Sequence, residues 1–247
     1  MTSAAPHLGD AVLRPVRAHH AFEACVEQLG TAIRLGVYPR GSALPAEREL
    51  AARLQVSRAT LREAMAALRE AGLVETTRGR GGGTVVVFKP PLPSTRRPAQ
   101  ANADARREWL DALAYRRIVE PGACDLAAGR RLNDEERERL LASHEAVATA
   151  RNRTEHRQAD SRFHLTIAAL ADSARVVHAV TEVQAVLNEM LSLIPVLDRN
   201  IEHSDRQHRD ILDAILHCDQ LAARDAMEEH CDDTAALLHG LLAGPPG

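Results

Sequence analysis

A proline-rich stretch at residues 89–105 constrains this chain more than any other feature of its 247 residues. The stretch reads KPPLPSTRRPAQANADA, and it lacks the hydrophobic periodicity that a packed element needs, so it predicts a linker. Short β-prone runs occur only before it, whereas the sequence after it has helical periodicity throughout. We therefore expect a flexible N-terminal arm at 1–18 and two domains, at 19–88 and 106–242.

The composition favours a mainly α-helical protein. Only six residues are aromatic, and good helix formers such as Ala, Leu, Arg and Glu dominate, which disfavours an all-β fold. The cysteines are scattered and form no CxxC pair, so we expect reduced thiols in a cytoplasmic protein; they are Cys25, Cys124, Cys218 and Cys231. We find no signal peptide and no apolar run of membrane-spanning length, so no membrane partner is expected.

The first domain has the pattern of a winged helix-turn-helix. A helix begins near His19, and a second is predicted from Pro45 to Leu54. After the short connection at 55–56, Ser57 is suited to cap a third helix, whose apolar face comprises Leu61, Ala64, Met65 and Leu68. Residues 73–77 and 84–88 are short β-prone runs around a basic, glycine-rich tip, which predicts a hairpin wing.

The predicted third helix carries side chains suited to the DNA major groove. Arg58 and Arg62 lie four residues apart and share a face, and arginine can read guanine with two hydrogen bonds. The hydroxyls of Ser57 and Thr60 suit phosphates, and further cationic contacts would come from Arg48, Arg78 or Arg80. Residues 1–90 hold 12 Lys and Arg against 8 Asp and Glu, which fits DNA binding there. The alternative is an ordinary solvated helix face.

The second domain is predicted as a bundle of six antiparallel helices. Their expected ranges are 106–130, 134–151, 155–171, 174–198, 201–217 and 220–242. Suitable N-cap residues stand at the predicted helix starts, namely Asn133, Thr154, Ser173, Asn200 and Asp219.

Four residues of this domain form a candidate metal site. Asp160 and His164 lie four apart on one predicted helix and so project from the same face. His208 and His230 lie about equally far from the turn near Cys218, which places them at similar heights in an antiparallel hairpin. Three imidazoles and a carboxylate would suit zinc, nickel or manganese, with positions open for a ligand. For each histidine alone, a structural role in packing is the alternative.

The sequence resembles two known families, the first of them over about residues 20–88. The segments LPAERELA (44–51), VSRATLREA (56–64) and GLV (72–74) resemble the winged helix of the GntR family. The resemblance implies operator contacts from the matching residues Arg48, Ser57, Arg58, Thr60, Arg62 and Gly79. Ala59 departs from the family pattern, and we assign it no base contact. A homodimer on a palindromic operator is also implied.

Residues 106–240 resemble the FCD effector domain of the FadR subfamily. The similarity is carried by YRRIVEP (115–121), by DSRFH (160–164) and by the two later histidines. It implies that Asp160, His164, His208 and His230 bind a divalent metal ion, zinc first, and that the effector is a small carboxylate. The position of Arg116 implies that it faces this ligand, although a structural ion pair is an equal alternative. Six helices would indicate the shorter, VanR-like form of the domain.

Together these features predict a transcription regulator and not an enzyme. We expect an organic acid effector to release the protein from operator DNA, as in a repressor, although the sequence leaves the sign of the response open. One alternative is a metal-dependent hydrolase with the same four ligands. Another is an architectural DNA-binding protein that responds to no effector.

Overall fold

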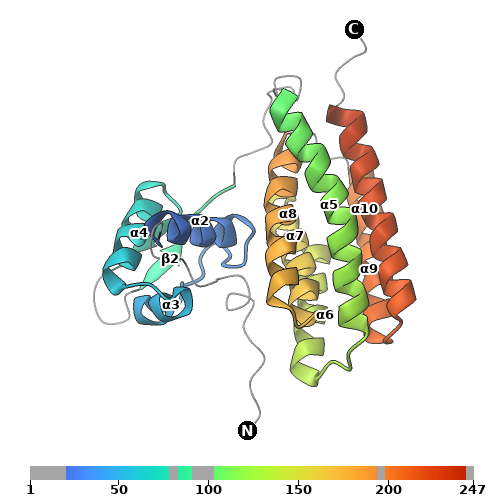
Figure 1. Cartoon of the computed structure of the whole chain (residues 1–247), viewed down its shortest axis with the longest axis horizontal. Helices are drawn as coiled ribbons and strands as arrows, with labels where there is room; N and C mark the ends of the chain where they lie inside the picture. Colours follow the sequence, from blue (N-terminus) through green and yellow to red (C-terminus); the bar gives the residue numbers. More distant parts are fainter. Residues whose placement is uncertain (1–20, 78–82, 91–102, 194–197, 243–247) are drawn as a thin grey trace. The chain divides into compact units, whose positions relative to one another are not determined.

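The computed structural model describes residues 21–77, 83–90, 103–193 and 198–242 (Figure 1). The chain forms two compact units that divide between Pro90 and Pro91, inside the stretch predicted as a linker. The N-terminal unit combines helices with a two-stranded sheet, and the described part of the C-terminal unit is all helical. The predicted fold class is thereby confirmed. The predicted arm at 1–18 lies outside the described residues.

The described part of the N-terminal unit has the order helix, helix, helix, hairpin. Its helices are α2 (Ala21–Arg34), α3 (Glu47–Leu54) and α4 (Arg58–Glu70). Strands β1 (Val74–Thr76) and β2 (Thr84–Val86) pair antiparallel, with Val74 opposite Val86. Helix α3 begins two residues later than predicted, because Ala46 is still extended, with ψ at 143°. The hairpin tip, which holds the predicted DNA contacts Arg78 and Gly79, lies outside the described residues.

Helices α3 and α4 are fixed by their ends and by their apolar faces. Gln55 takes a left-handed conformation, with φ at 54°, that ends α3, and the Ser57 side chain accepts a hydrogen bond from the Thr60 amide at the start of α4. The predicted inner face of α4 is buried, and α4 packs against α2 and α3. The buried side chains of these three helices include Leu29, Ile33, Leu50, Leu54, Leu61, Ala64, Met65 and Leu68. The opposite face of α4 is therefore left to solvent.

The described part of the C-terminal unit contains six helices. They are α5 (Ala103–Ala128), α6 (Asp134–Ala148), α7 (Arg153–Leu170), α8 (Ala174–Ser192), α9 (Asp198–Leu216) and α10 (Gln220–Leu242). Helix α5 lies against α7, α8 and α10, and α10 also packs on α9 (Figure 1). Helix α5 starts inside the stretch predicted as linker and continues through Pro121.

The helix starts confirm some predicted caps and correct others. Asn133 caps α6 in a capping box with Glu136, and Ser173 caps α8, as predicted. Helix α7 is capped by Asn152 instead of Thr154, because the Asn152 carboxamide accepts hydrogen bonds from two backbone amides. Helix α9 begins at Asp198, so Asn200 lies within it instead of at its cap.

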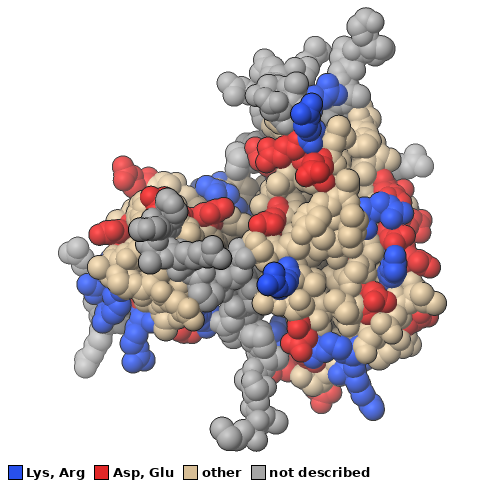
Figure 2. Space-filling view, viewed as in Figure 1, with Lys and Arg blue, Asp and Glu red and all other residues tan. Residues whose placement is uncertain are grey.

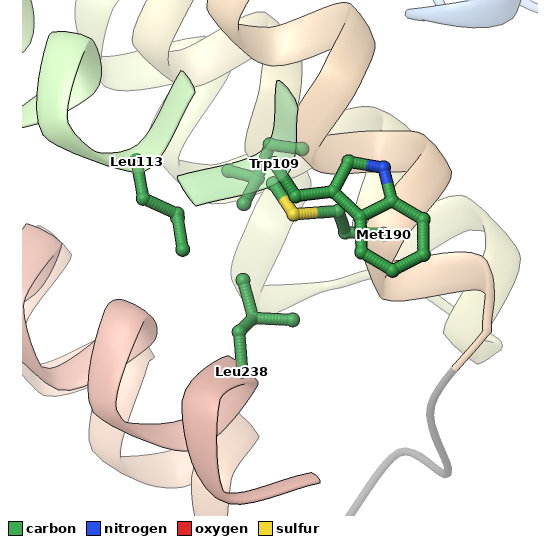
Figure 3. Packing of buried hydrophobic residues seen from close by; sticks show 5 residues of the cluster. Trp109, Leu113, Met190 and Leu238 are labelled. Carbon is green, nitrogen blue, oxygen red and sulfur yellow. The ribbon is translucent and has the colours of Figure 1, made fainter. Parts of the chain in front are cut away.

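Part of the C-terminal core is a cluster of large side chains from three helices. Trp109 and Leu113 of α5 pack on Leu187 and Met190 of α8 and on Leu238 of α10 (Figure 3). Leu238 is fully buried, and Trp109 is 7% exposed. The cluster holds α5, α8 and α10 together, and the polar side chains described below lie on the same helices within about three turns of it.

Two surface properties complete the fold. No helix in the described ranges combines the length and apolarity needed to span a bilayer. In the view of Figure 2, basic side chains project from the lower edge of the N-terminal unit, where Figure 1 places α3 and the lower turns of α4. Acidic side chains lie along the upper edge of that unit in the same view.

Candidate DNA-contact helix and buried histidine cluster

The first turns of α4 present the side chains that the sequence predicts to meet DNA. Arg58 and Arg62 are exposed, and so is Arg48 on α3. The Nε atom of Arg62 donates to Glu47 Oε2 at 3.1 Å, with the Arg62 side chain still 61% exposed. An exposed pair of this kind contributes little to stability, so it leaves Arg62 able to exchange Glu47 for another acceptor.

The two hydroxyls at the start of α4 contact each other. Ser57 Oγ accepts from the Thr60 amide at 3.0 Å and lies 2.8 Å from Thr60 Oγ1. Their main role in this structure is therefore to cap the helix. The first amides of a helix also favour an anion such as a phosphate, so contact of Ser57 and Thr60 with DNA stays a prediction.

In the C-terminal unit, three histidines predicted as metal ligands come together inside the bundle. His164 on α7, His208 on α9 and His230 on α10 are at most 3% exposed. Their ring centroids are 4.7–5.4 Å apart, and each ring offers a nitrogen within 4.8 Å of the others. The buried ring of Phe163 lies against His208, with 4.9 Å between centroids, and excludes water on that side.

The fourth predicted ligand lies at the same place. Asp160 precedes His164 by one turn of α7, and its Oδ1 atom is 3.4 Å from His208 Nε2. The structure therefore clusters the three predicted histidines, and it places the fourth predicted residue, Asp160, next to His208.

The ring nitrogens of the cluster lack the partners that buried polar atoms normally have. Within the described residues, neither nitrogen of His164 nor of His208 makes a hydrogen bond. Asp160 and Glu120 approach these rings at ion-pair distance, but the rings are not turned to donate to them. His230 is different, since its Nδ1 lies 3.1 Å from Gln207 Oε1 and can donate to it.

Burial keeps the imidazoles of His208 and His230 neutral. It lowers the pKa of His208 to about 4, and it is also the main cause that holds the pKa of His230 well below its ordinary value. At pH 7 both rings therefore offer a nitrogen lone pair. Neutral imidazoles together with one carboxylate form a donor set that suits zinc and similar divalent ions, so the residues fit a metal ion.

A buried ion pair lies directly beside the cluster. Arg116 on α5 is 1% exposed, and its Nε donates to Glu120 Oε2 at 2.8 Å. Gln184 Nε2 donates to the other oxygen, Glu120 Oε1, at 2.6 Å. Burial raises the pKa of Glu120, but the neighbouring Arg116 and His164 outweigh it and hold this pKa well below its usual range. Glu120 is therefore a carboxylate.

Arg116 is predicted either to face a ligand or to form a structural pair, and its geometry is compatible with both. One edge of its guanidinium is paired with Glu120, whereas Nη1 is buried without a hydrogen bond to any described residue. Arg116, Asp160 and His230 also line a cavity of about 160 Å³. Its walls include the polar side chains of Gln207, His203 and Asp233 and the apolar ones of Leu187, Leu191 and Leu237.

The roles of Glu120, Gln184 and Gln207 were not predicted from the sequence. Glu120 lies four residues after Arg116 on a predicted helix, a spacing that signals an ion pair and would have revealed it. Gln184 and Gln207 reach the site from α8 and α9, and no sequence pattern marks them, because their partners lie 64 and 23 residues away.

Comparison with known proteins identifies both units. The model of the gntR family of bacterial regulatory proteins matches residues 22–86, and the FCD domain model matches residues 111–233. The fold resembles that of Escherichia coli McbR/YncC, with a TM-score of 0.54 at 16% identity over 89% of this chain and 97% of that one. At this identity the likeness concerns the fold alone.

Two curated relatives extend the match. A Mycobacterium gastri protein, provisionally named HTH-type transcriptional regulator RmpR, is 37% identical over 170 residues, which are 66% of this chain. The chain spans 59% of the length of that relative. An Escherichia coli protein, provisionally named L-lactate dehydrogenase operon regulatory protein, is 31% identical over 208 residues, which are 77% of this chain and 75% of the relative. These matches are to transcription regulators and not to enzymes, as expected. The chain therefore belongs to the gntR family of bacterial regulatory proteins and carries an FCD domain.

Proposed function

We propose that this protein is a DNA-binding transcription regulator whose FCD domain binds a small carboxylate at Arg116 and at a divalent metal ion. One observation carries the effector half of the proposal. Three buried imidazoles cluster beside Asp160, and two of them, His164 and His208, make no hydrogen bond to the described residues. Asp160 and His230 of this cluster line a cavity that the buried Arg116 also lines. Buried polar atoms without partners are costly unless a ligand satisfies them.

The DNA-binding half rests on α4 and its surroundings. The N-terminal turns of a recognition helix contact base edges, and in this protein they carry exposed Arg58 and Arg62. Arg48 on α3, together with Arg78 and Gly79 at the wing, would add contacts to the backbone or the minor groove. Because family members bind as pairs, we propose a homodimer on a palindromic operator, with one α4 in each half-site.

We propose as metal ligands the residues Asp160, His164, His208 and His230. Zinc is the first candidate for the bound ion, and nickel or manganese are the alternatives. When bound, such an ion supplies a Lewis-acidic position for a carboxylate oxygen. The protein itself contributes the imidazoles of His208 and His230, which burial keeps neutral, and an apolar neighbour, Phe163, which packs against His208.

Arg116 gives the cavity its preference for an anion. Its free Nη1 edge can donate to a carboxylate oxygen, and a buried guanidinium binds carboxylates more strongly than an exposed one. A cavity of about 160 Å³ suits an acid of a few heavy atoms and not a long acyl chain. The relative named for an L-lactate dehydrogenase operon points to the same class, since lactate is a small hydroxycarboxylate.

The DNA-binding proposal is tested by fluorescence anisotropy with promoter DNA from the protein's own operon. Arg58→Ala should weaken specific binding by about 1–3 kcal/mol, roughly a 5- to 150-fold loss. Arg69→Ala is the matched control, because Arg69 lies on the same helix at its C-terminal end and should leave affinity unchanged. Equal losses in the two variants would refute the placement of the recognition helix.

The effector proposal is tested by metal analysis of the purified protein and by titrating the protein–DNA complex with small acids. L-lactate, glycolate and related hydroxy acids are the probes, and L-lactamide is the uncharged control. Release of DNA by an acid and not by the amide would show a carboxylate-controlled repressor. DNA affinity that responds to no acid would instead indicate an architectural DNA-binding protein.

A further inference from the structure

Glu120 lies beside the candidate site, but it is neither one of the four proposed metal ligands nor the proposed carboxylate-binding residue. Its carboxylate is 2% exposed, yet side chains from four helices meet at it. Arg116 Nε of α5 and Gln184 Nε2 of α8 donate to it at 2.8 and 2.6 Å. His164 Nδ1 of α7 lies 3.1 Å from its Oε2 atom, and the Cys231 thiol of α10 donates to the same oxygen at 3.7 Å.

The first consequence concerns Arg116. An arginine side chain has several rotatable bonds, and a buried one must be held by a partner to present a fixed face. Glu120 takes the Nε edge of the guanidinium, which leaves Nη1 buried and without a hydrogen bond within the described chain. Arg116 is thereby held at the cavity wall, and its Nη1 group is available to donate to a ligand.

The second consequence concerns His164. A carboxylate oxygen beside Nδ1 favours the imidazole tautomer that carries its proton on Nδ1. In that tautomer Nε2 keeps its lone pair, and Nε2 has no hydrogen-bond partner among the described residues. The His164 ring is not turned to donate to Glu120 in this structure, so a rotation of the ring would be needed to complete the hydrogen bond. Carboxylates that accept such a bond from metal-binding histidines fix the ring orientation and raise the basicity of the nitrogen that binds the ion.

We propose that Glu120 is a positioning residue that acts on both halves of the effector site, holding Arg116 for the carboxylate and His164 for the metal ion. The inference rests on the proposed function. Because one carboxylate holds both side chains, a change at either is transmitted to the other. Binding of the metal ion and of the acid is then coupled, and the coupling is reciprocal.

The substitution Glu120→Gln tests this role with nearly unchanged volume. Arg116 and Gln184 donate to different oxygens of Glu120, and a carboxamide replaces one of these oxygens with an NH2 group. One of the two donors therefore loses its acceptor. Calorimetry with Zn²⁺ alone should show a 10- to 100-fold loss of affinity. L-lactate binding to the zinc-loaded protein should fall as well, and the coupling between the two ligands should weaken to the part that direct contact of the acid with the ion provides. Glu120→Asp keeps the charge and should restore part of both affinities.

Glu108→Gln is the matched control, because Glu108 lies on the same helix but is exposed. It should bind both ligands like the wild type. If the wild type binds zinc and an acid, and Glu120→Gln binds them equally well, the role of Glu120 is refuted while the proposed function stands. If the wild type binds neither ligand, both proposals fall.

A measurement on the unaltered, metal-free protein avoids any folding defect of the variants. Two-bond couplings in ¹⁵N-histidine NMR spectra distinguish the two neutral tautomers, and the His164 signals are assigned by their absence from a His164→Gln sample. We expect the proton on Nδ1, next to Glu120. A proton on Nε2 would overturn the inference, because Nε2 would then have no lone pair to offer to the metal ion.

Discussion

Replacement of His208 by leucine should change the stability of the protein in opposite directions with and without metal. His208 is fully buried, and both of its ring nitrogens lack a hydrogen bond in the described structure. An unsatisfied buried polar group costs about 1–3 kcal/mol. Leucine has a similar size and no polar atom, so the metal-free variant should be more stable than the metal-free wild type by about that amount.

When metal is bound, the wild type should be more stable than the His208→Leu variant. A ligand that binds only the folded state at a thousandfold its Kd stabilises that state by about 4 kcal/mol. The variant loses one of the four proposed ligands and with it most of this gain. For a domain of this size, 1 kcal/mol corresponds to about 2–4 °C in melting temperature. The variant should therefore melt higher than the wild type in a chelator and lower in excess Zn²⁺.

Thermal denaturation followed by circular dichroism measures both effects. His144→Leu is the matched control, since His144 contacts the same Phe163 ring from α6 but is not one of the three clustered histidines. Its effect should be equal in chelator and in Zn²⁺. If His208→Leu destabilises the protein equally under both conditions, His208 is a packing residue and the metal proposal fails.

The pH dependence gives a second readout of the same variant. Burial lowers the folded-state pKa of His208 to about 4, below the ordinary value of 6.5, so the folded protein favours the neutral ring. The metal-free wild type should consequently lose stability as the pH falls from 6.5 toward 4. His208→Leu should lose less over this interval, because it has no ring to protonate there.

Three further predictions concern other parts of the second unit. Asn133→Ala removes the capping box of α6 and should cost about 1 kcal/mol, which urea denaturation measures. Burial lowers the pKa of His156, but its hydrogen bond to Asp205 at 3.2 Å outweighs this and raises it, so the pair stabilises the fold below pH 6.5 and less as the pH rises through the raised value. Asp205→Asn should lower the pKa of His156 in an NMR titration, and an unchanged pKa would refute the pairing. Cys218 is exposed whereas Cys124 is buried with a pKa raised well above normal, so a thiol reagent should label the first rapidly and the second only on unfolding.

Local signals explain why much of the fold could be predicted. The apolar face of α4, the Ser57 cap and the hairpin runs depend on neighbours within a few residues, and each of these features appears as expected. Errors arose where a competing local group was stronger. Asn152 caps α7 because its carboxamide reaches two amides, which the hydroxyl predicted at Thr154 does not.

The helical class, the division at the proline-rich stretch and the candidate set Asp160, His164, His208 and His230 could be predicted from local patterns, because helical spacing and the symmetry of a helical hairpin can be recognised in the sequence. The surroundings of these four residues depend on how the helices pack. Glu120 and Gln184 are 64 residues apart, and their hydrogen bond exists because α5 and α8 pack together. Burial, which keeps His208 neutral and leaves Arg116 with an unpaired donor, likewise depends on the packing of several helices at once. Such properties belong to no single segment of the chain, so no sequence pattern contains them.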